Sequence, residues 1–150
     1  MAISLSGFAD KLNEVMPVII KEFSRYQANE LYKGKITLPQ FLIMDFLNKK
    51  GEARMTDLAH FMGVSTAAVT GIVDRLVKYG YVLRGFEPED RRVIKIKLTP
   101  KGYMLVKKIN LQRREMLINV FGKISDVDRQ EYLRILMEIK DVLMKKMNAG

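Results

Sequence analysis

The sequence predicts a mainly α-helical protein with one small β-hairpin. Over most of the chain, apolar residues recur every three or four positions, which is the period of an amphipathic helix. One stretch, from Tyr81 to Leu98, alternates instead and is divided by a Pro88-Glu89-Asp90 turn, so it predicts two antiparallel strands. Glycines of the kind that end helices separate the periodic segments, at Gly51, Gly63, Gly80 and Gly122.

Composition indicates a single globular domain spanning residues 1–150. The chain has 48% hydrophobic and 29% charged residues, and no apolar run approaches the ~20 residues of a membrane span. The segment from Met1 to Leu5 lacks the basic and apolar regions of a secretory signal. We therefore expect a soluble protein of the cytoplasm with no membrane partner.

The charge balance favours a polyanionic partner, although basic soluble proteins of other kinds exist. Lysines and arginines number 26 against 17 acidic residues, a net charge of +9. The chain has no cysteine and a single histidine, His60, so we expect no disulfide, thiol sensor or metal site. It shows neither a nucleophile paired with a base nor a glycine loop for phosphates, which argues against an enzyme and a cofactor.

The first predicted helix runs from Leu5 to about Leu31, and Lys33-Gly34-Lys35 ends it. Pro17 removes one backbone donor, so the segment is either one kinked helix or a short lead-in before a helix that starts at Pro17. The apolar stripe consists of Leu5, Phe8, Leu12, Met16, Ile19, Phe23 and Tyr26.

Two helices are predicted next. Thr37-Leu38-Pro39 opens a helix that continues to Lys50, where Gly51 stops it. Thr56 is the expected N-cap of a shorter helix, which Gly63 closes with a left-handed backbone. The residues of this short helix expected to face inward are Leu58, Ala59 and Met62.

Ser65 is the expected N-cap of the following helix, which ends at Gly80. Its apolar residues share one face because they are spaced at i, i+3, i+4 and i+7. They are Val69, Ile72, Val73 and Leu76. The opposite face is small near its start and charged near its end, and consists of Thr66, Ala67, Thr70, Gly71, Asp74, Arg75 and Lys78.

The hairpin is expected to pair a strand over 81–86 with one over 93–98. In the second strand, alternation predicts one buried and one basic face. The expected buried residues are Ile94, Ile96 and Leu98, and the basic ones are Lys95 and Lys97.

Two helices complete the chain. Thr99-Pro100 starts one as N-cap and first-turn proline, and Gly122 ends it. Ser125 with Asp128 resembles a capping box for the last. The apolar stripes are Leu105, Val106, Ile109, Met116, Leu117 and Val120, then Leu133, Leu136, Ile139, Leu143 and Met147.

Two short helices joined by Gly63-Val64, followed by a hairpin, form the pattern of a winged helix-turn-helix over about residues 37–99. Such a fold binds duplex DNA by inserting its second helix into the major groove. The small outer face around Thr66, Ala67 and Thr70 suits that role. A solvated helix face is the commoner explanation for such residues alone, but the packing residues and glycine turn around them favour DNA binding.

The hairpin tip carries Asp90, Arg91 and Arg92. Alone it would be an ordinary charged turn, but after such a helix its arginines are placed to reach the minor groove. We expect Asp90 to hold Arg92 in a fixed fork, or to pair with Arg75 or Arg84. The residues expected to contact phosphates are Lys78, Arg84, Lys95 and Lys97.

The motifs from Thr56 to Gly102 resemble those of the MarR family of transcriptional regulators. The matching stretches are Thr56-Asp57-Leu58-Ala59, Val64-Ser65, Val69-Thr70, Val73-Asp74-Arg75-Leu76, Gly80-Tyr81-Val82, Arg84, Asp90-Arg91-Arg92 and Leu98-Thr99-Pro100-Lys101-Gly102. The resemblance implies a homodimer in which helices over about 5–31 and 100–147 interlock. It also implies a repressor of a pseudo-palindromic operator, released by a small lipophilic, aromatic or anionic ligand.

Carried over by position, the resemblance matches Asp90 and Arg92 to the family's wing signature. Gly71 departs from it, because many members have arginine or another polar residue there, so operator preference does not transfer. The full set of expected DNA-binding residues is Ser65, Thr66, Ala67, Thr70, Gly71, Arg75, Lys78, Arg84, Asp90, Arg91, Arg92 and Lys95. The alternative function is a winged-helix module for protein–protein contacts without ligand control.

Overall fold

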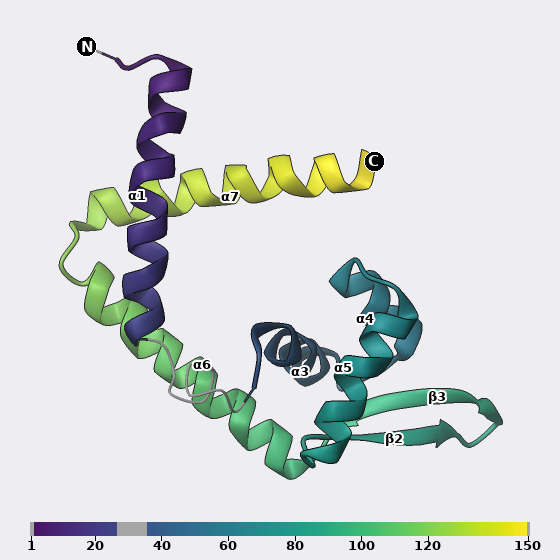
Figure 1. The fold of residues 1–150 in the computed structure, drawn as a ribbon. Helices are drawn as coiled ribbons and strands as arrows, with labels where there is room; N and C mark the ends of the chain where they lie inside the picture. The colour runs from purple at the N-terminus through teal and green to yellow at the C-terminus, as the bar shows by residue number, and fades with distance from the viewer. Residues whose placement is uncertain (1, 27–35, 150) are drawn as a thin grey trace. The chain divides into compact units, whose positions relative to one another are not determined.

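The computed structural model of the chain describes residues 2–26 and 36–149 (Figure 1). The described residues form six helices and one three-stranded sheet, which agrees with the predicted mainly α-helical class. They divide into two compact units that meet between Arg113 and Arg114. None of the described helices is long and apolar enough to cross a membrane.

Helix α1 (Leu5–Tyr26) begins at Leu5 and continues through Pro17. This settles the alternative that Pro17 left open, since no separate helix starts there. The predicted end near Leu31 and the stop at 33–35 lie outside the described residues. The stripe residues Leu5, Phe8, Leu12, Met16 and Ile19 are all exposed.

Helix α3 (Leu38–Lys50) begins and ends where the sequence predicts. Thr37 is its N-cap: the hydroxyl accepts from the amide of Gln40, whose side-chain oxygen accepts from the amide of Thr37. Gly51 ends the helix with a φ of 88°, in the region that favours glycine. The helix contributes Phe41, Ile43, Met44 and Leu47 to the core.

The predicted N-cap Thr56 is wrong. Helix α4 (Met55–Met62) starts two residues earlier than that cap would place it, and Arg54 is its N-cap. The carboxylate of Asp57 accepts a hydrogen bond of 3.0 Å from the amide of Arg54, so the acid caps the helix from its first turn. Arg54 also ends strand β1 (Glu52–Arg54), which the sequence analysis missed.

Gly63 and Ser65 join α4 to α5 (Thr66–Lys78) as expected. Gly63 has φ 67° and ψ 32°, the left-handed conformation predicted for it. The hydroxyl of Ser65 accepts from the amide of Ala68 at 3.1 Å. The inner face of α5 places Val69, Val73 and Leu76 in the core, with Ile72 packed against it.

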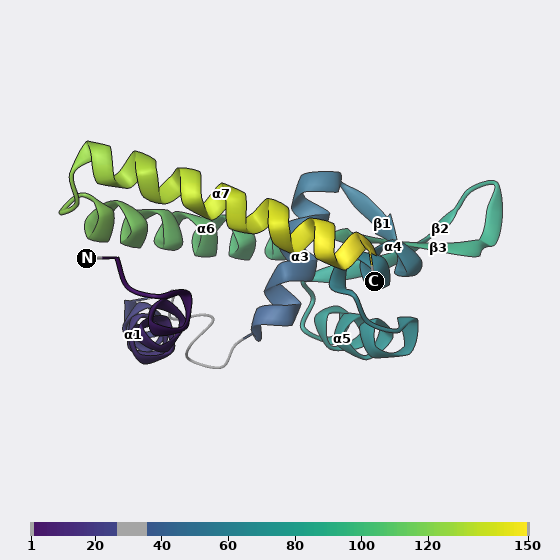
Figure 2. The ribbon, with the colours of Figure 1, turned by 90° about the horizontal axis from the view of Figure 1, so that it is seen from above.

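The sheet has the strand order β1-β3-β2, so the wing strands β2 (Val82–Glu87) and β3 (Asp90–Leu98) are joined by a third strand. Ile96 lies opposite Ala53 on one side and Arg84 on the other, and its side chain is fully buried. The prediction that Ile94 is buried is wrong: it is 39% exposed. Figure 2 shows the reason, because the hairpin extends beyond helices α3, α4 and α5.

Helix α6 (Pro100–Phe121) is capped by Thr99, whose hydroxyl accepts from the amide of Gly102 and donates to the carbonyl of Gly80. A Cβ at Gly102 would lie 2.0 Å from the carbonyl oxygen of Tyr81, so only glycine fits there. Asn110 donates to Asp45 of α3 at 3.0 Å. These contacts attach the first half of α6 to the winged region.

The second unit contains the end of α6 and helix α7 (Asp126–Ala149). Ser125 accepts from the amide of Asp128, as the predicted cap requires. Arg129 donates to the carbonyl of Phe121 at 2.9 Å, and the rings of Phe121 and Tyr132 stack with centroids 5.5 Å apart. These contacts hold the turn between the two helices.

Candidate nucleic-acid interface

The outer face of α5 is open to solvent. Thr66, Ala67 and Gly71 are exposed along its first two turns, and Thr70 is half-buried between them. Arg75 and Lys78 follow on the last turn, both exposed. This face therefore has the expected order, with small residues first and cations last.

Two hydroxyls on this face are held by the backbone. The hydroxyl of Thr70 donates to the carbonyl of Thr66 at 2.7 Å, which fixes its rotamer. The hydroxyl oxygen of Ser65 accepts from the amide of Ala68, so the hydroxyl proton of Ser65 is available to donate to a partner. Both side chains are therefore oriented before any partner arrives.

Gly71 is not required by the fold. Its φ lies outside the left-handed region, and a Cβ built there has no neighbouring atom within 4 Å. Glycine inside a helix lowers its stability relative to alanine. A structural explanation for this glycine is therefore lacking, whereas the close approach of a partner to α5 would explain it.

The wing holds Arg92 in the fork that the sequence predicts. Arg92 donates to Asp90 through its Nε at 3.1 Å, its Nη2 at 3.2 Å and its amide at 3.0 Å. These hydrogen bonds lower the pKa of Asp90, so the carboxylate stays ionised throughout the neutral range. The Arg92 side chain is nevertheless 91% exposed. A guanidinium is thus oriented and still free to contact a partner.

Arg84, a predicted phosphate contact, is paired within the protein. It forms an ion pair with Asp74 of α5, and not with Asp90. The register places Arg84 on the sheet face that turns toward α5, opposite the buried Ile96. The pair therefore links α5 to the wing.

Lys95 also departs from expectation, because its ammonium is paired with Glu52 and Glu87. Strand alternation puts it on the sheet face opposite to Ile96 and to the packed helices. Its charge is compensated within the protein, and it does not share the surface of α5. The predicted phosphate contact has no support from this geometry.

The remaining predicted residues gather within one unit. The outer face of α5 and the wing tip, including the exposed Arg91, belong to the region before Arg113. Sequence reasoning missed the roles of Asp74 and Glu87, whose partners lie on other elements. His60 is exposed, and the described residues contain no group of histidine and acidic side chains that could hold a metal.

The fold and this site define a winged helix-turn-helix DNA-binding protein. A family model described as the MarR family matches residues 36–94. The transcriptional regulator FarR of Neisseria gonorrhoeae is 30% identical over 116 residues, covering 75% of this chain and 80% of FarR. YsmB of Bacillus subtilis, an HTH-type transcriptional regulator, is 29% identical over 128 residues, covering 85% and 86%.

Two solved structures show the same fold. FabT of Streptococcus pneumoniae, in complex with DNA, matches with a TM-score of 0.80 at 19% identity over 91% of this chain and 98% of that one. BpsR of Bordetella bronchiseptica, whose DNA binding is regulated by 6-hydroxynicotinic acid, matches with a TM-score of 0.68 at 20% identity over 94% and 99%. The chain belongs to the MarR family of transcriptional regulators, a class of DNA-binding proteins that are not enzymes.

Proposed function

We propose that the protein is a homodimeric repressor that binds a pseudo-palindromic operator in the cytoplasm. The observation that carries this proposal is the pairing, within one unit, of an open α5 face with an exposed Arg92 held by Asp90. A major-groove reader beside a minor-groove reader is what a winged DNA-binding protein requires. The comparison with FabT, solved with DNA, supports the same use of the fold.

The contacts divide into three kinds. Thr66, Ala67 and Thr70 read base edges, with Gly71 leaving room for the duplex. Arg91 and Arg92 read the shape of the minor groove. Phosphates are contacted from the two ends of α5, by Ser65, Arg75 and Lys78.

Arg84, Asp90 and Lys95 have indirect roles in this proposal. Each is occupied by an ion pair inside the protein. The side chains of Arg84 and Lys95 are only 34% and 28% exposed, against 91% for the paired Arg92. They are therefore less accessible to a phosphate than the exposed Lys78. They orient the elements that touch DNA.

Homodimerisation is supported by apolar surface at both ends of the chain. The stripes of α1 and α7 are exposed, including Phe8 and Leu12 in the first and Leu133 and Leu136 in the second. Exposed apolar patches of this extent mark interaction surfaces. The proposed dimerisation helices extend over about residues 5–31 and 100–147, flanking a winged part over about 37–99 in one domain.

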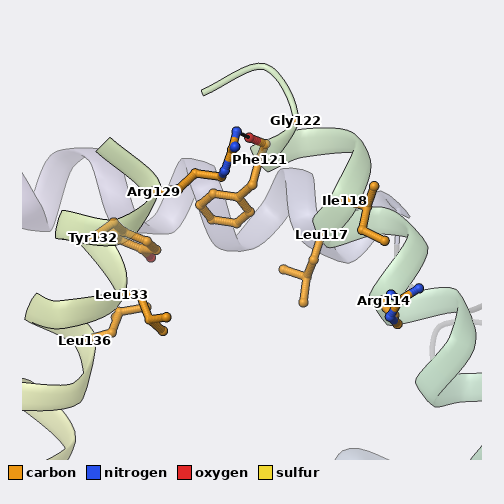
Figure 3. Close-up of a pocket in the computed structure, with 9 residues that line it drawn as sticks. All are labelled: Arg114, Leu117, Ile118, Phe121, Gly122, Arg129, Tyr132, Leu133 and Leu136. Carbon is orange, nitrogen blue, oxygen red and sulfur yellow. Dashed lines mark hydrogen bonds between the residues drawn. The ribbon is translucent and has the colours of Figure 1, made fainter. Parts of the chain in front are cut away.

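A cavity of about 650 Å³ lies between the end of α6 and α7 (Figure 3). Leu117, Ile118 and Phe121 line it from α6, and Tyr132, Leu133 and Leu136 line it from α7. Its walls are mostly apolar, so a second copy of the chain is the occupant we propose. A two-fold dimer would place two α5 helices about 34 Å apart, in successive major grooves.

Ligand control is the remaining part of the proposal. BpsR, which shares the fold, is regulated by an aromatic acid, and a small aromatic or anionic lipophilic compound is the ligand class we propose here. A thermal-shift screen with aromatic carboxylic acids, followed by DNA titration, tests this part. An acid that raises the melting temperature and weakens DNA binding supports it, whereas acids that change neither argue against it.

The function itself is tested by selection on random duplexes followed by titration of the enriched sequence at several salt concentrations. We expect one palindromic sequence to be enriched, with an affinity that falls steeply as salt rises. Binding that is weak and insensitive to salt would instead favour the protein–protein module. Neither the geometry nor the comparisons give that alternative any support.

A further inference from the structure

Lys95 lies between two carboxylates supplied by the other two strands of the sheet. Its Nζ is 2.9 Å from Oε1 of Glu52 in β1 and 2.8 Å from Oε2 of Glu87, the last residue of β2. Donation by the Lys95 ammonium to the carboxylate of Glu87, followed by donation to that of Glu52, raises the pKa of Lys95 above its usual value. The side chains of Lys95 and Glu87 are only 28% and 30% exposed. Their ion pair is therefore partly shielded from solvent.

These contacts span the irregular part of the wing. The ladder between β2 and β3 is regular from Val82 to Phe86, but its register shifts between Phe86 and Glu87, where Glu87 pairs with Asp90. At such a shift the backbone ladder alone does not fix the direction of the strands beyond it. The tip residues Arg91 and Arg92 follow directly.

We propose that Glu52, Lys95 and Glu87, here called the wing cluster, set the direction of the wing tip and so place Arg92 for the minor groove. Lys95 is then a positioning residue and not a phosphate contact. The effect on DNA rests on the proposed function, whereas the effect on the wing itself is a property of the free protein. The two are measured separately.

The first test asks in which direction the affinity for DNA changes when a negative charge is removed. Glu87→Gln removes a negative charge from a DNA-binding protein, which by charge alone strengthens binding to phosphates. The wing cluster predicts the opposite, a weakening of about three- to tenfold, because Lys95 loses one partner and the tip loses its direction. The probe is the duplex that the wild-type chain enriches from a random pool.

Glu89→Gln is the matched control. Glu89 is two residues away in the exposed turn and forms no ion pair within the described part of the chain. The same change there is expected to leave the affinity unchanged or slightly higher. Glu87→Gln binding as tightly as Glu89→Gln would overturn the proposal.

The second test is hydrogen exchange in the free protein. Backbone amides over residues 86–92 should exchange about tenfold faster in Glu87→Gln than in Glu89→Gln, while amides of α5 stay unchanged. Equal exchange rates in the two variants would overturn the proposed role of the wing cluster, even if the variants differ in their affinity for DNA. If the wild-type chain enriches no duplex, the proposed function is overturned. The exchange comparison then still tests whether the wing cluster orders the wing in the free protein.

The third test separates positioning from contact at Lys95. Lys95→Gln should weaken binding while leaving the slope of log affinity against log salt unchanged, because Lys95 does not displace a counterion from a DNA phosphate. Lys78→Gln should reduce that slope by about one unit. A slope reduced equally by both variants would identify Lys95 as a phosphate contact and contradict the proposal.

Discussion

The winged region and the terminal helices differ in how far they bury their apolar residues. The core cluster lies entirely between Ile36 and Ile109, and most of its members are fully buried. Among the described side chains of α1 and α7, by contrast, none is buried, although both helices carry apolar stripes. The winged region completes its interior within one chain, whereas the terminal helices leave their apolar stripes exposed, as is typical of interaction surfaces.

The largest expected effect tests the closed interior of the winged region. Leu76 of α5 is fully buried, so Leu76→Ala should lower the free energy of unfolding by about 2–5 kcal/mol through lost burial and the cavity left behind. Urea denaturation at fixed protein concentration measures this. Lys78→Ala, on the exposed face of the same helix, is the control and should stay within about 0.5 kcal/mol. A similarly small loss for Leu76→Ala would contradict a closed core.

The next effect concerns the open surface of α7. Leu136 lines the cavity beside α6, so Leu136→Asp should weaken dimerisation by about 2–4 kcal/mol, as expected for a central interface residue. Sedimentation over a range of concentrations gives the dissociation constant. Val127→Asp introduces the same charge on the same helix at a 77% exposed position opposite to Leu136, and it should leave the dimer intact. A Leu136→Asp protein that stays dimeric would locate the interface elsewhere.

A smaller effect is expected at the wing, on DNA and not on folding. Arg92→Ala should cost about 1–3 kcal/mol of operator binding because a minor-groove contact is lost. Its melting temperature should not change, since the side chain is exposed. Asp90→Asn is the companion variant: it removes a negative charge yet should also weaken binding, because Arg92 loses its fork. Unchanged affinity for both would rule out the role of the wing tip.

The smallest effect combines stability and binding at one residue. Gly71→Ala should stabilise folding by about 0.5–1 kcal/mol, since helical glycine is unfavourable and the added methyl group meets no neighbour. The same methyl group should weaken operator binding if DNA approaches α5 at this position. Thermal unfolding and DNA titration of one preparation give both values. A variant that gains stability without losing affinity would show that Gly71 is not close to the duplex.

Local signals made much of the fold predictable. Thr37, Gly63 and Ser65 act through hydrogen bonds or backbone angles within a few residues, and all three occur where the sequence placed them. Strand β1 was missed because three residues are too short to show a period. Its existence depends on pairing with β3, more than forty positions along the chain.

The site was predictable where its contacts are local. Asp90 and Arg92 are two residues apart, so their fork followed from the sequence. The ion pairs of Arg84 and Lys95 did not follow from the sequence, because their carboxylate partners, Asp74 and Glu52, are close only after folding. The sequence alone does not show which lysines and arginines form ion pairs with carboxylates in the folded protein.

The hydrogen bond from Thr70 to the carbonyl of Thr66 has a consequence for the operator. A hydroxyl whose proton is committed to its own helix presents only lone pairs, with its methyl group alongside. In the major groove, adenine and cytosine offer amino hydrogens that such an oxygen accepts, and thymine offers a methyl group to pack against. Guanine presents acceptors alone, so the base facing Thr70 is expected to be any of the other three.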